Sequence, residues 1–114
     1  MNEKQVVVYE VHRDKMTGRV RLFRDGDEIR PRKSQALRNH SPDGFETGYG
    51  GSGPSQLALA ILLDHMGEAR ADDAEGVYQT FKWERIAGAN LTPGEFYCIP
   101  STWIDEFLAR EASI

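Results

Sequence analysis

The stretch that decides the fold is Gly48-Tyr49-Gly50-Gly51-Ser52-Gly53-Pro54-Ser55-Gln56-Leu57-Ala58-Leu59-Ala60-Ile61-Leu62-Leu63-Asp64-His65-Met66. Four glycines in its first six residues require unusual backbone angles or the close approach of another group. Pro54 suits the first position of a helix, and Ser52 or Gly53 can cap it. The apolar run 57–63 covers every side of such a helix. We therefore predict a helix over 54–67 that is the most buried element of the protein.

Strands are predicted before this helix. Apolar and polar residues alternate over 5–13, which indicates a strand, and 14–18 has the composition of a turn. Residues 19–24 form the predicted return strand, and 28–32 suit a third short strand. The segment 34–38 fits one turn of helix, although its pattern is ambiguous.

Two further helices are predicted after it, near 74–87 and 101–111, and a polar loop over 68–73. Residues 96–99 suit a short strand or an extended link. Aromatic residues at helical spacing predict core or a self-association face: Tyr78, Phe81, Trp83, Trp103 and Phe107. The expected fold is α+β, with an N-terminal antiparallel meander of two or three strands packed against about three helices.

Length and composition indicate one domain over 1–114, with 39% hydrophobic residues available for a core. The single cysteine, Cys98, excludes an intrachain disulfide and a cysteine-based zinc site, and fits a reducing compartment. His12, His40 and His65 are widely separated, so we expect no metal and no cofactor. We see no signal peptide, and the longest apolar run is too short to cross a bilayer. The expected location is cytoplasmic.

The charge is distributed unevenly along the chain. Residues 1–40 carry a balance of +4 and residues 41–114 a balance of −8. This predicts a basic region made by the first strands, or charges dispersed over solvated faces. Arginines on these strands, with Phe23 for stacking, suit nucleic acid, but the pI of about 5.3 disfavours direct nucleic-acid binding.

The Gly-rich loop is a candidate anion site, because free N–H groups at a helix N-terminus bind anions. Its candidate ligand-binding residues are Tyr49, Gly50, Gly51, Ser52 and Gly53. The loop lacks the Gly-Lys-Ser/Thr ending of a P-loop, and no strong hydrophobic strand precedes it. A tight loop packed against the core explains the same glycines equally well.

Four cations precede the loop and could complete such a site: Arg30, Arg32, Lys33 and Arg38. Arginine forks bind phosphate in a bidentate manner, so Arg32 and Arg38 are included among the candidate ligand-binding residues. We expect at least one of the four within about a Debye length, ~10 Å, of the Gly51 and Ser52 amides. Alternatively, Asp43 and Glu46 pair with these cations and no vacancy remains.

Catalysis is the weaker interpretation. His40, Ser41, Asp43 and Glu46 lie within seven positions and could hold an acid–base pair, and Ser52 could be a nucleophile. The nucleophile-elbow pattern fails, because Pro54 stands in place of its final glycine. We favour a non-enzymatic role and assign no catalytic residue.

Three segments together resemble domain-of-unknown-function family 6166: residues 41–46 (Ser-Pro-Asp-Gly-Phe-Glu), residues 48–62, and Tyr78-Gln79-x-Phe81-Lys82-Trp83. The resemblance covers roughly residues 5–110. A Trp commonly follows Phe-Glu in this family, whereas Thr47 stands here. The resemblance implies a cytosolic accessory protein of a prokaryote or phage and brings no assigned activity.

Three functions follow from these observations. The first is a small non-enzymatic binding module with the Gly-rich loop as a site for an anion, nucleotide or other small ligand. The second is a phage or plasmid accessory protein that inhibits host defence, by binding a host protein or by sequestering a nucleotide. The third is a small hydrolase or transferase. The expected partner is an anionic small molecule or a host protein, no membrane is involved, and a homodimer is compatible with the aromatic residues.

Overall fold

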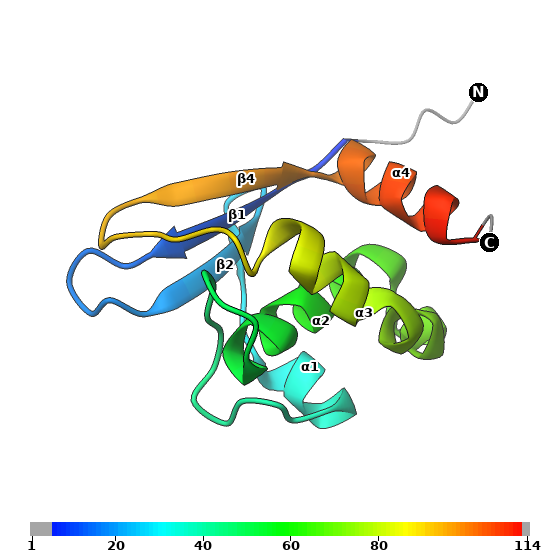
Figure 1. Ribbon diagram of the computed structural model, residues 1–114, viewed down its shortest axis with the longest axis horizontal. Coiled ribbons are helices and arrows are strands. Elements are labelled where there is room, and N and C mark those ends of the chain that lie inside the picture. Colours follow the sequence, from blue (N-terminus) through cyan, green and yellow to red (C-terminus); the bar gives the residue numbers. More distant parts are fainter. Residues whose placement is uncertain (1–5, 113–114) are drawn as a thin grey trace.

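A computed structural model describes residues 6–112 (Figure 1). Four strands and four α-helices follow one another with one short 3-10 helix. In chain order they are β1 (Val8–Arg13), β2 (Val20–Arg24), β3 (Asp27–Ile29), α1 (Arg32–Leu37), α2 (Ser52–Met66), η1 (Glu68–Arg70), α3 (Ala71–Arg85), β4 (Phe96–Pro100) and α4 (Ser101–Ala112). No helix among the described residues is long and apolar enough to cross a membrane.

The strands form one antiparallel sheet in the order β3-β2-β1-β4. The predicted N-terminal meander is confirmed as β1, β2 and β3. The fourth strand is β4, so the segment 96–99 is a strand rather than an extended link, and it lies beside β1 with Tyr9 opposite Ile99. The paired residues of β1 and β4 are more than eighty positions apart in the chain, so no local sequence pattern predicts this pairing.

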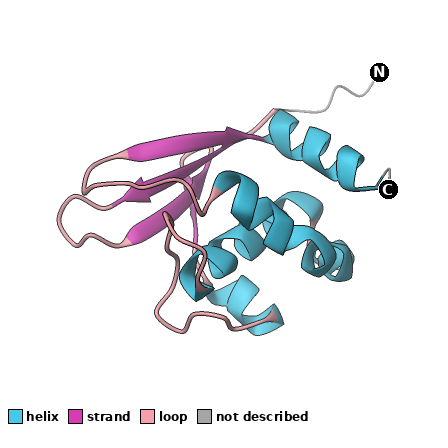
Figure 2. Ribbon diagram, viewed as in Figure 1, coloured by secondary structure: helices cyan, strands magenta, loops and turns pink. Residues whose placement is uncertain are grey.

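The protein has two layers, because the helices lie on one side of the sheet (Figure 2). Alternate strand residues, among them Tyr9, Val11, Leu22 and Ile99, face the helices and are buried. Helix α2 is buried over the whole range 53–63. The prediction that this helix is the most buried element is confirmed, and the α+β fold class with it.

Several predicted boundaries are wrong. Helix α2 begins at Ser52 with Gly51 as its N-cap, so Pro54 is its third residue. Strand β3 ends at Ile29, since Pro31 instead caps α1, which begins at Arg32. The predicted polar loop 68–73 is the helical turn η1 and the start of α3. Strand β1 begins at Val8, and the predicted start at residue 5 lies outside the described residues.

Candidate functional site

The glycines of the loop are required by close packing. A Cβ on Gly50 would collide with the Trp83 ring, and one on Gly51 would collide with the Tyr49 ring. A Cβ on Gly53 would lie 2.5 Å from the Cβ of Glu46. The glycine density therefore has a steric explanation at each of these positions and is not by itself an argument for a ligand.

We expect Gly53→Ala to lower the free energy of unfolding by about 1–3 kcal/mol, because the added methyl group overpacks the contact with Glu46. The matched control is Gly76→Ala in α3, where a Cβ would meet nothing within 4 Å. There the substitution should stabilise the protein by roughly 0.5–1 kcal/mol, since alanine favours the helix. Urea unfolding followed by circular dichroism measures both. Equal effects of the two variants would contradict the steric explanation.

Lys82 lies beneath the loop and is only 5% exposed. Its ammonium donates a hydrogen bond to the carbonyl oxygen of Gly50 at 3.0 Å and lies 4.5 Å from the centre of the Trp83 ring. Within residues 6–112, no carboxylate pairs with it. A positive charge that no carboxylate compensates makes this site electropositive.

The first turn of α2 adds to this positive potential. The helix has no side-chain hydrogen bond at its N-cap and no acidic residue in its first turn. The Ser55 N–H already bonds to the Gly51 carbonyl oxygen at 3.1 Å, as a helix requires. The first N–H groups of a helix have no partner within it, and they carry the positive end of its dipole.

Two aromatic rings flank the loop on its outer side. Trp83 is 63% exposed and Tyr49 is 51% exposed, although Trp83 was predicted as core or as part of a self-association face. The core prediction is wrong for Trp83 because its position on α3 turns the ring outward over Gly50. The rings and the ammonium together suit a ligand with both a planar group and a negative charge.

Gln56, which is fully buried, attaches the chain before the loop to α2. Its Oε1 accepts hydrogen bonds from the backbone N–H groups of His40 at 2.8 Å and Ser41 at 3.1 Å. Its Nε2 donates to Ser34 Oγ at 2.9 Å and to the Arg38 carbonyl oxygen at 3.2 Å. One side chain thus positions α1 and the segment 38–41 beside the helix.

This attachment brings His40 to α3. Its Nε2 lies 2.5 Å from the Tyr78 hydroxyl. Burial lowers the pKa of His40, and the positive charges of Arg38 and Lys82 lower it further. Arg38 forms an ion pair with Glu75 at 2.8 Å, and this ion pair compensates its charge. Glu75 and Lys82 are two helical turns apart on α3, so Arg38 lies on the same side of this helix as Lys82.

Two of the other acid–base candidates, Glu46 and Ser52, form no hydrogen bond with a histidine in the described part of the chain. Glu46 accepts a hydrogen bond from Arg13 at 2.9 Å. Ser52 is exposed, and its hydroxyl bonds to no histidine or carboxylate in the described part of the chain. Groups of histidine, cysteine and carboxylate residues that could hold a metal ion are likewise absent from residues 6–112.

A family model matches residues 9–110, and its description is a family of unknown function, DUF6166. The chain belongs to the DUF6166 family. Comparison with curated proteins and with solved structures found no match. The resemblance that the sequence suggested is therefore confirmed over nearly the whole described chain.

Thr47, which follows Phe45-Glu46 in this DUF6166 member, has a structural role. It is 4% exposed, and its hydroxyl lies 2.9 Å from the Ile86 carbonyl oxygen and 3.0 Å from that of Ala89. The same hydroxyl lies 3.2 Å from the Tyr97 hydroxyl. Burial raises the pKa of Tyr97 to about 12, so the phenol stays neutral in this contact.

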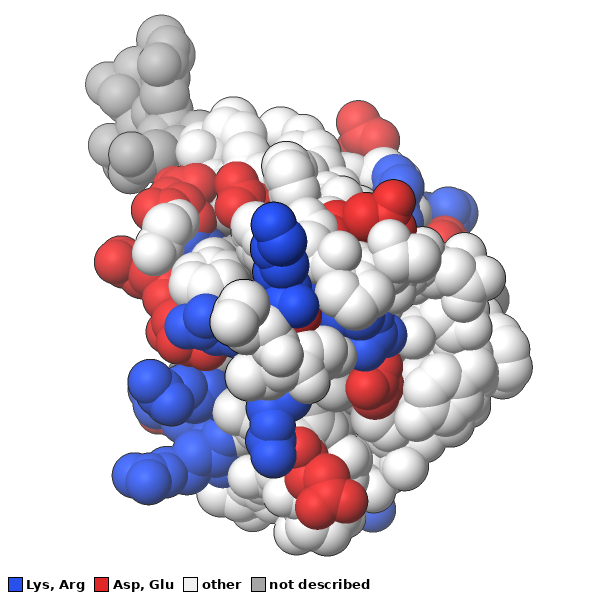
Figure 3. All heavy atoms as spheres, turned by 90° about the vertical axis from the view of Figure 1, so that its left-hand side faces the viewer, with Lys and Arg blue, Asp and Glu red and all other residues white. Residues whose placement is uncertain are grey.

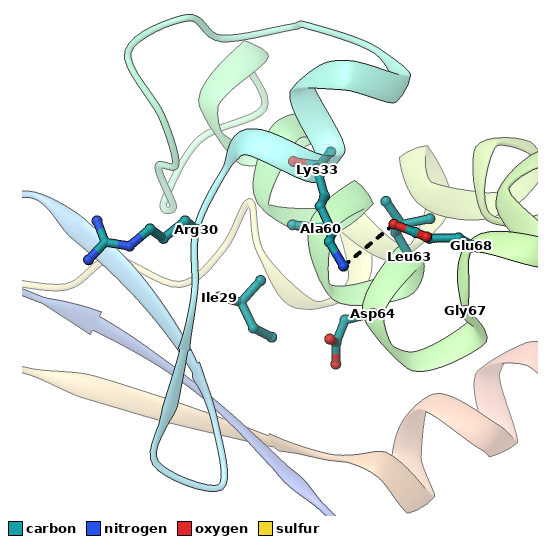
Figure 4. A pocket seen from close by; sticks show the side chains of 9 residues that line it. Ile29, Arg30, Lys33, Ala60, Leu63, Asp64, Gly67 and Glu68 are labelled. Atoms are coloured by element: carbon teal, nitrogen blue, oxygen red, sulfur yellow. Dashed lines mark ion pairs between the residues drawn. The ribbon is translucent and has the colours of Figure 1, made fainter.

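The remaining predicted cations of this DUF6166 member line cavities to which residues 49–53 do not contribute. Arg30 and Lys33 border a cavity of about 250 Å³ between β3 and the C-terminal end of α2, where Lys33 pairs with Glu68 at 3.5 Å (Figure 4). Arg30 pairs with Glu28 at 3.7 Å. Arg32 lines a neighbouring cavity of about 710 Å³ to which no loop residue contributes. The expectation that one of these cations completes the loop site stays a prediction.

Charges of both signs share the surface at the hairpin end of the molecule, where Lys and Arg side chains stand among Asp and Glu (Figure 3). The arginines of the predicted basic region are partly compensated: on β2, Arg21 pairs with Glu28 at 2.9 Å. These observations favour dispersed, paired charges over a single basic surface.

Lys82 is the site residue that sequence reasoning missed. The sequence does contain a signal for it. Tyr78, Phe81 and Lys82 lie on one face of a helix, where the lysine interrupts an apolar stripe. A lysine in such a position has its stem buried, and its ammonium must find a polar group. Only the tertiary structure shows that this group is the carbonyl of Gly50.

Proposed function

We propose that this protein is a non-enzymatic binding module of the cytoplasm of a prokaryotic or phage-infected cell. Its ligand is a small anion with a planar group, of the nucleotide class, held at the Gly-rich loop. The observation that carries the proposal is the ammonium of Lys82, a residue only 5% exposed: it has no carboxylate partner among the described residues and lies beside the N-terminus of α2. An anion at this site would compensate that charge.

The two halves of the ligand follow from the surroundings of Lys82. The N–H groups of the first turn of α2 and the ammonium favour a phosphate or carboxylate. The exposed rings of Tyr49 and Trp83 offer faces on which a planar group stacks. This combination supports a nucleotide over inorganic phosphate, which would leave both rings unused.

Substitution of Lys82 tests the proposal. The probes are nucleotides, cyclic nucleotides and inorganic phosphate, screened by thermal unfolding of the protein. A ligand at 100 times its Kd adds about 2.7 kcal/mol to the free energy of unfolding. We expect Lys82→Gln to weaken binding roughly 10- to 100-fold, since a hydrogen bond to a charged group contributes about 1.5–3 kcal/mol. Calorimetric titration gives the Kd of each variant.

The matched control is Lys33→Gln, which changes the net charge equally but at a side chain that is 79% exposed. It should leave the Kd within about twofold of the original value, because exposed charges interact weakly through salt solution. Quenching of Trp83 fluorescence by the bound ligand, absent in Trp83→Phe, locates the site. The proposal is wrong if no probe binds, or if the two lysine variants behave alike.

A protein partner is the second candidate, and the exposure of Trp83 and Tyr49 against the same loop favours it, since such residues dominate the energetics of interfaces. In this case the protein is an accessory factor of a phage or plasmid that inhibits host defence. Capture from host lysate with and without nuclease, comparing the original protein with Trp83→Ala, tests it. Capture that survives nuclease and is lost in the variant supports a protein partner, whereas unchanged capture by the variant contradicts it.

A further inference from the structure

The two edges of the sheet are protected differently. The strand β3 has three residues, and two of them, Asp27 and Glu28, carry carboxylates. The strand β4 at the opposite edge has five residues, Phe-Tyr-Cys-Ile-Pro, and none of them is charged. Natural sheets protect their edges from other strands with short or charged strands. By this criterion β3 is protected and β4 is open to pairing.

The free backbone groups of β4 follow from its pairing with β1. The Arg13 N–H donates to the Glu95 carbonyl oxygen at 3.0 Å, and the Ser101 N–H donates to that of Val7 at 2.8 Å. Hydrogen-bonded positions alternate in an antiparallel pair, so Phe96 and Cys98 direct their backbone groups away from β1. Neither of these two N–H groups has an acceptor within the described residues.

Within residues 6–112, no charged side chain of β4 protects this edge from another strand. Phe96 is 54% exposed and stacks on His12 at 4.8 Å between ring centres, and Cys98 is exposed. Glu95, which precedes the strand, turns its carboxylate back to the Thr92 N–H at 2.8 Å. Glu10, opposite Cys98 on β1, pairs with His12 at 2.8 Å.

We propose that two copies of this chain associate through β4 to form one continuous eight-stranded sheet, with the two-fold axis passing beside Cys98. In this register Cys98 lies opposite Cys98 of the second copy, and the two residues exchange a pair of backbone hydrogen bonds. Phe96 lies opposite Pro100 of the second copy and donates its N–H to that carbonyl oxygen. Pro100 has no N–H to leave unpaired, and its ring packs against the Phe96 ring on the open face.

The uncharged sequence of β4 favours a second copy as the occupant. Each chain carries a net charge of −4, so two copies repel over most of their surfaces. The uncharged strand β4 is a place where they approach without opposing carboxylates, and its Phe96–Pro100 pairing is satisfied by the same sequence on both sides. The inference uses the edge of the sheet and is independent of the loop site.

Sedimentation of the purified chain over a concentration series, combined with amide hydrogen exchange, tests the dimer. We expect a monomer–dimer equilibrium, with the Phe96 and Cys98 amides protected from exchange at high concentration and exposed on dilution. Cys98→Pro removes both central N–H donors at an edge position that tolerates proline, and should weaken the dimer roughly tenfold or more. Cys98→Ser keeps the N–H and should dimerise like the original chain.

Thermal unfolding of Cys98→Pro at low concentration shows that the variant still folds. The concentration-dependent exchange of the Phe96 amide in the original chain is a readout that needs no variant. A chain that stays monomeric at every concentration overturns the proposal. This holds even if the chain binds a strand of another added protein at the same edge. A dimer of undiminished affinity in Cys98→Pro, or exchange of Phe96 that ignores concentration, overturns it as well.

Discussion

Replacing Leu59 or Leu62 by alanine is expected to lower the free energy of unfolding by about 2–5 kcal/mol. Both side chains are fully buried in α2, the helix around which the rest of the protein packs. The cost has two sources, the lost transfer free energy of the deleted methyl groups and the cavity that rigid neighbours leave unfilled. Urea unfolding monitored by circular dichroism measures it.

The control for these variants is Met16→Ala, which truncates an apolar side chain that is 89% exposed. It should change the free energy of unfolding by no more than about 0.5 kcal/mol. If Leu59→Ala and Leu62→Ala unfold like the original protein, α2 is not the centre of the core and the fold described above is wrong.

Gln56→Leu should destabilise the protein by roughly 3 kcal/mol or more. Leucine has nearly the volume of glutamine. It cannot accept the hydrogen bonds that the backbone N–H groups of His40 and Ser41 donate to Gln56 Oε1. Each buried polar group left without a partner costs about 1–3 kcal/mol, and Ser34 Oγ loses its donor as well. The same urea titration provides the measurement.

Gln79→Leu is the matched control, because it makes the same substitution at an exposed position of α3 whose side chain only approaches Ser55 Oγ at 3.4 Å. Its effect should stay within about 0.5 kcal/mol. Hydrogen exchange separates a local effect from a global one: in Gln56→Leu the His40 and Ser41 amides should lose protection first. Retained protection of these amides would show that Gln56 does not hold the segment 38–41.

The local patterns of the sequence predicted most elements of the fold. Alternation over 5–13 and 19–24 indicated the first hairpin, and an apolar run that covers all sides of a helix indicated burial of α2. These signals are reliable because side-chain periods of 2 and 3.6 residues follow from backbone geometry alone. Helix boundaries were predicted less accurately. Pro54 also fits the third position of a helix, and the N-cap Gly51 has no side chain that would mark the start of α2 in the sequence.

The candidate site was predicted only in part. The sequence indicated the loop 49–53, but the reason for the glycine at position 50 lies far along the chain, in the ring of Trp83. Lys82 was absent from the predicted site, and Arg32 lines a cavity to which the loop does not contribute. A list of residue types near the loop cannot show which of them share a surface with it.

The sequence by itself determined the α+β class, the first hairpin and the buried helix after the Gly-rich loop, because each depends on neighbours within a few residues. The tertiary structure alone decided that β4 joins β1 and leaves one edge of the sheet open, that Gln56 holds the segment before the loop, and that a lysine ammonium without a carboxylate lies beneath Gly50. These three features each join residues 15 to about 90 positions apart. Such contacts are selected by the packing of the whole chain, since only the folded core excludes water from them and makes each unpaired polar group costly.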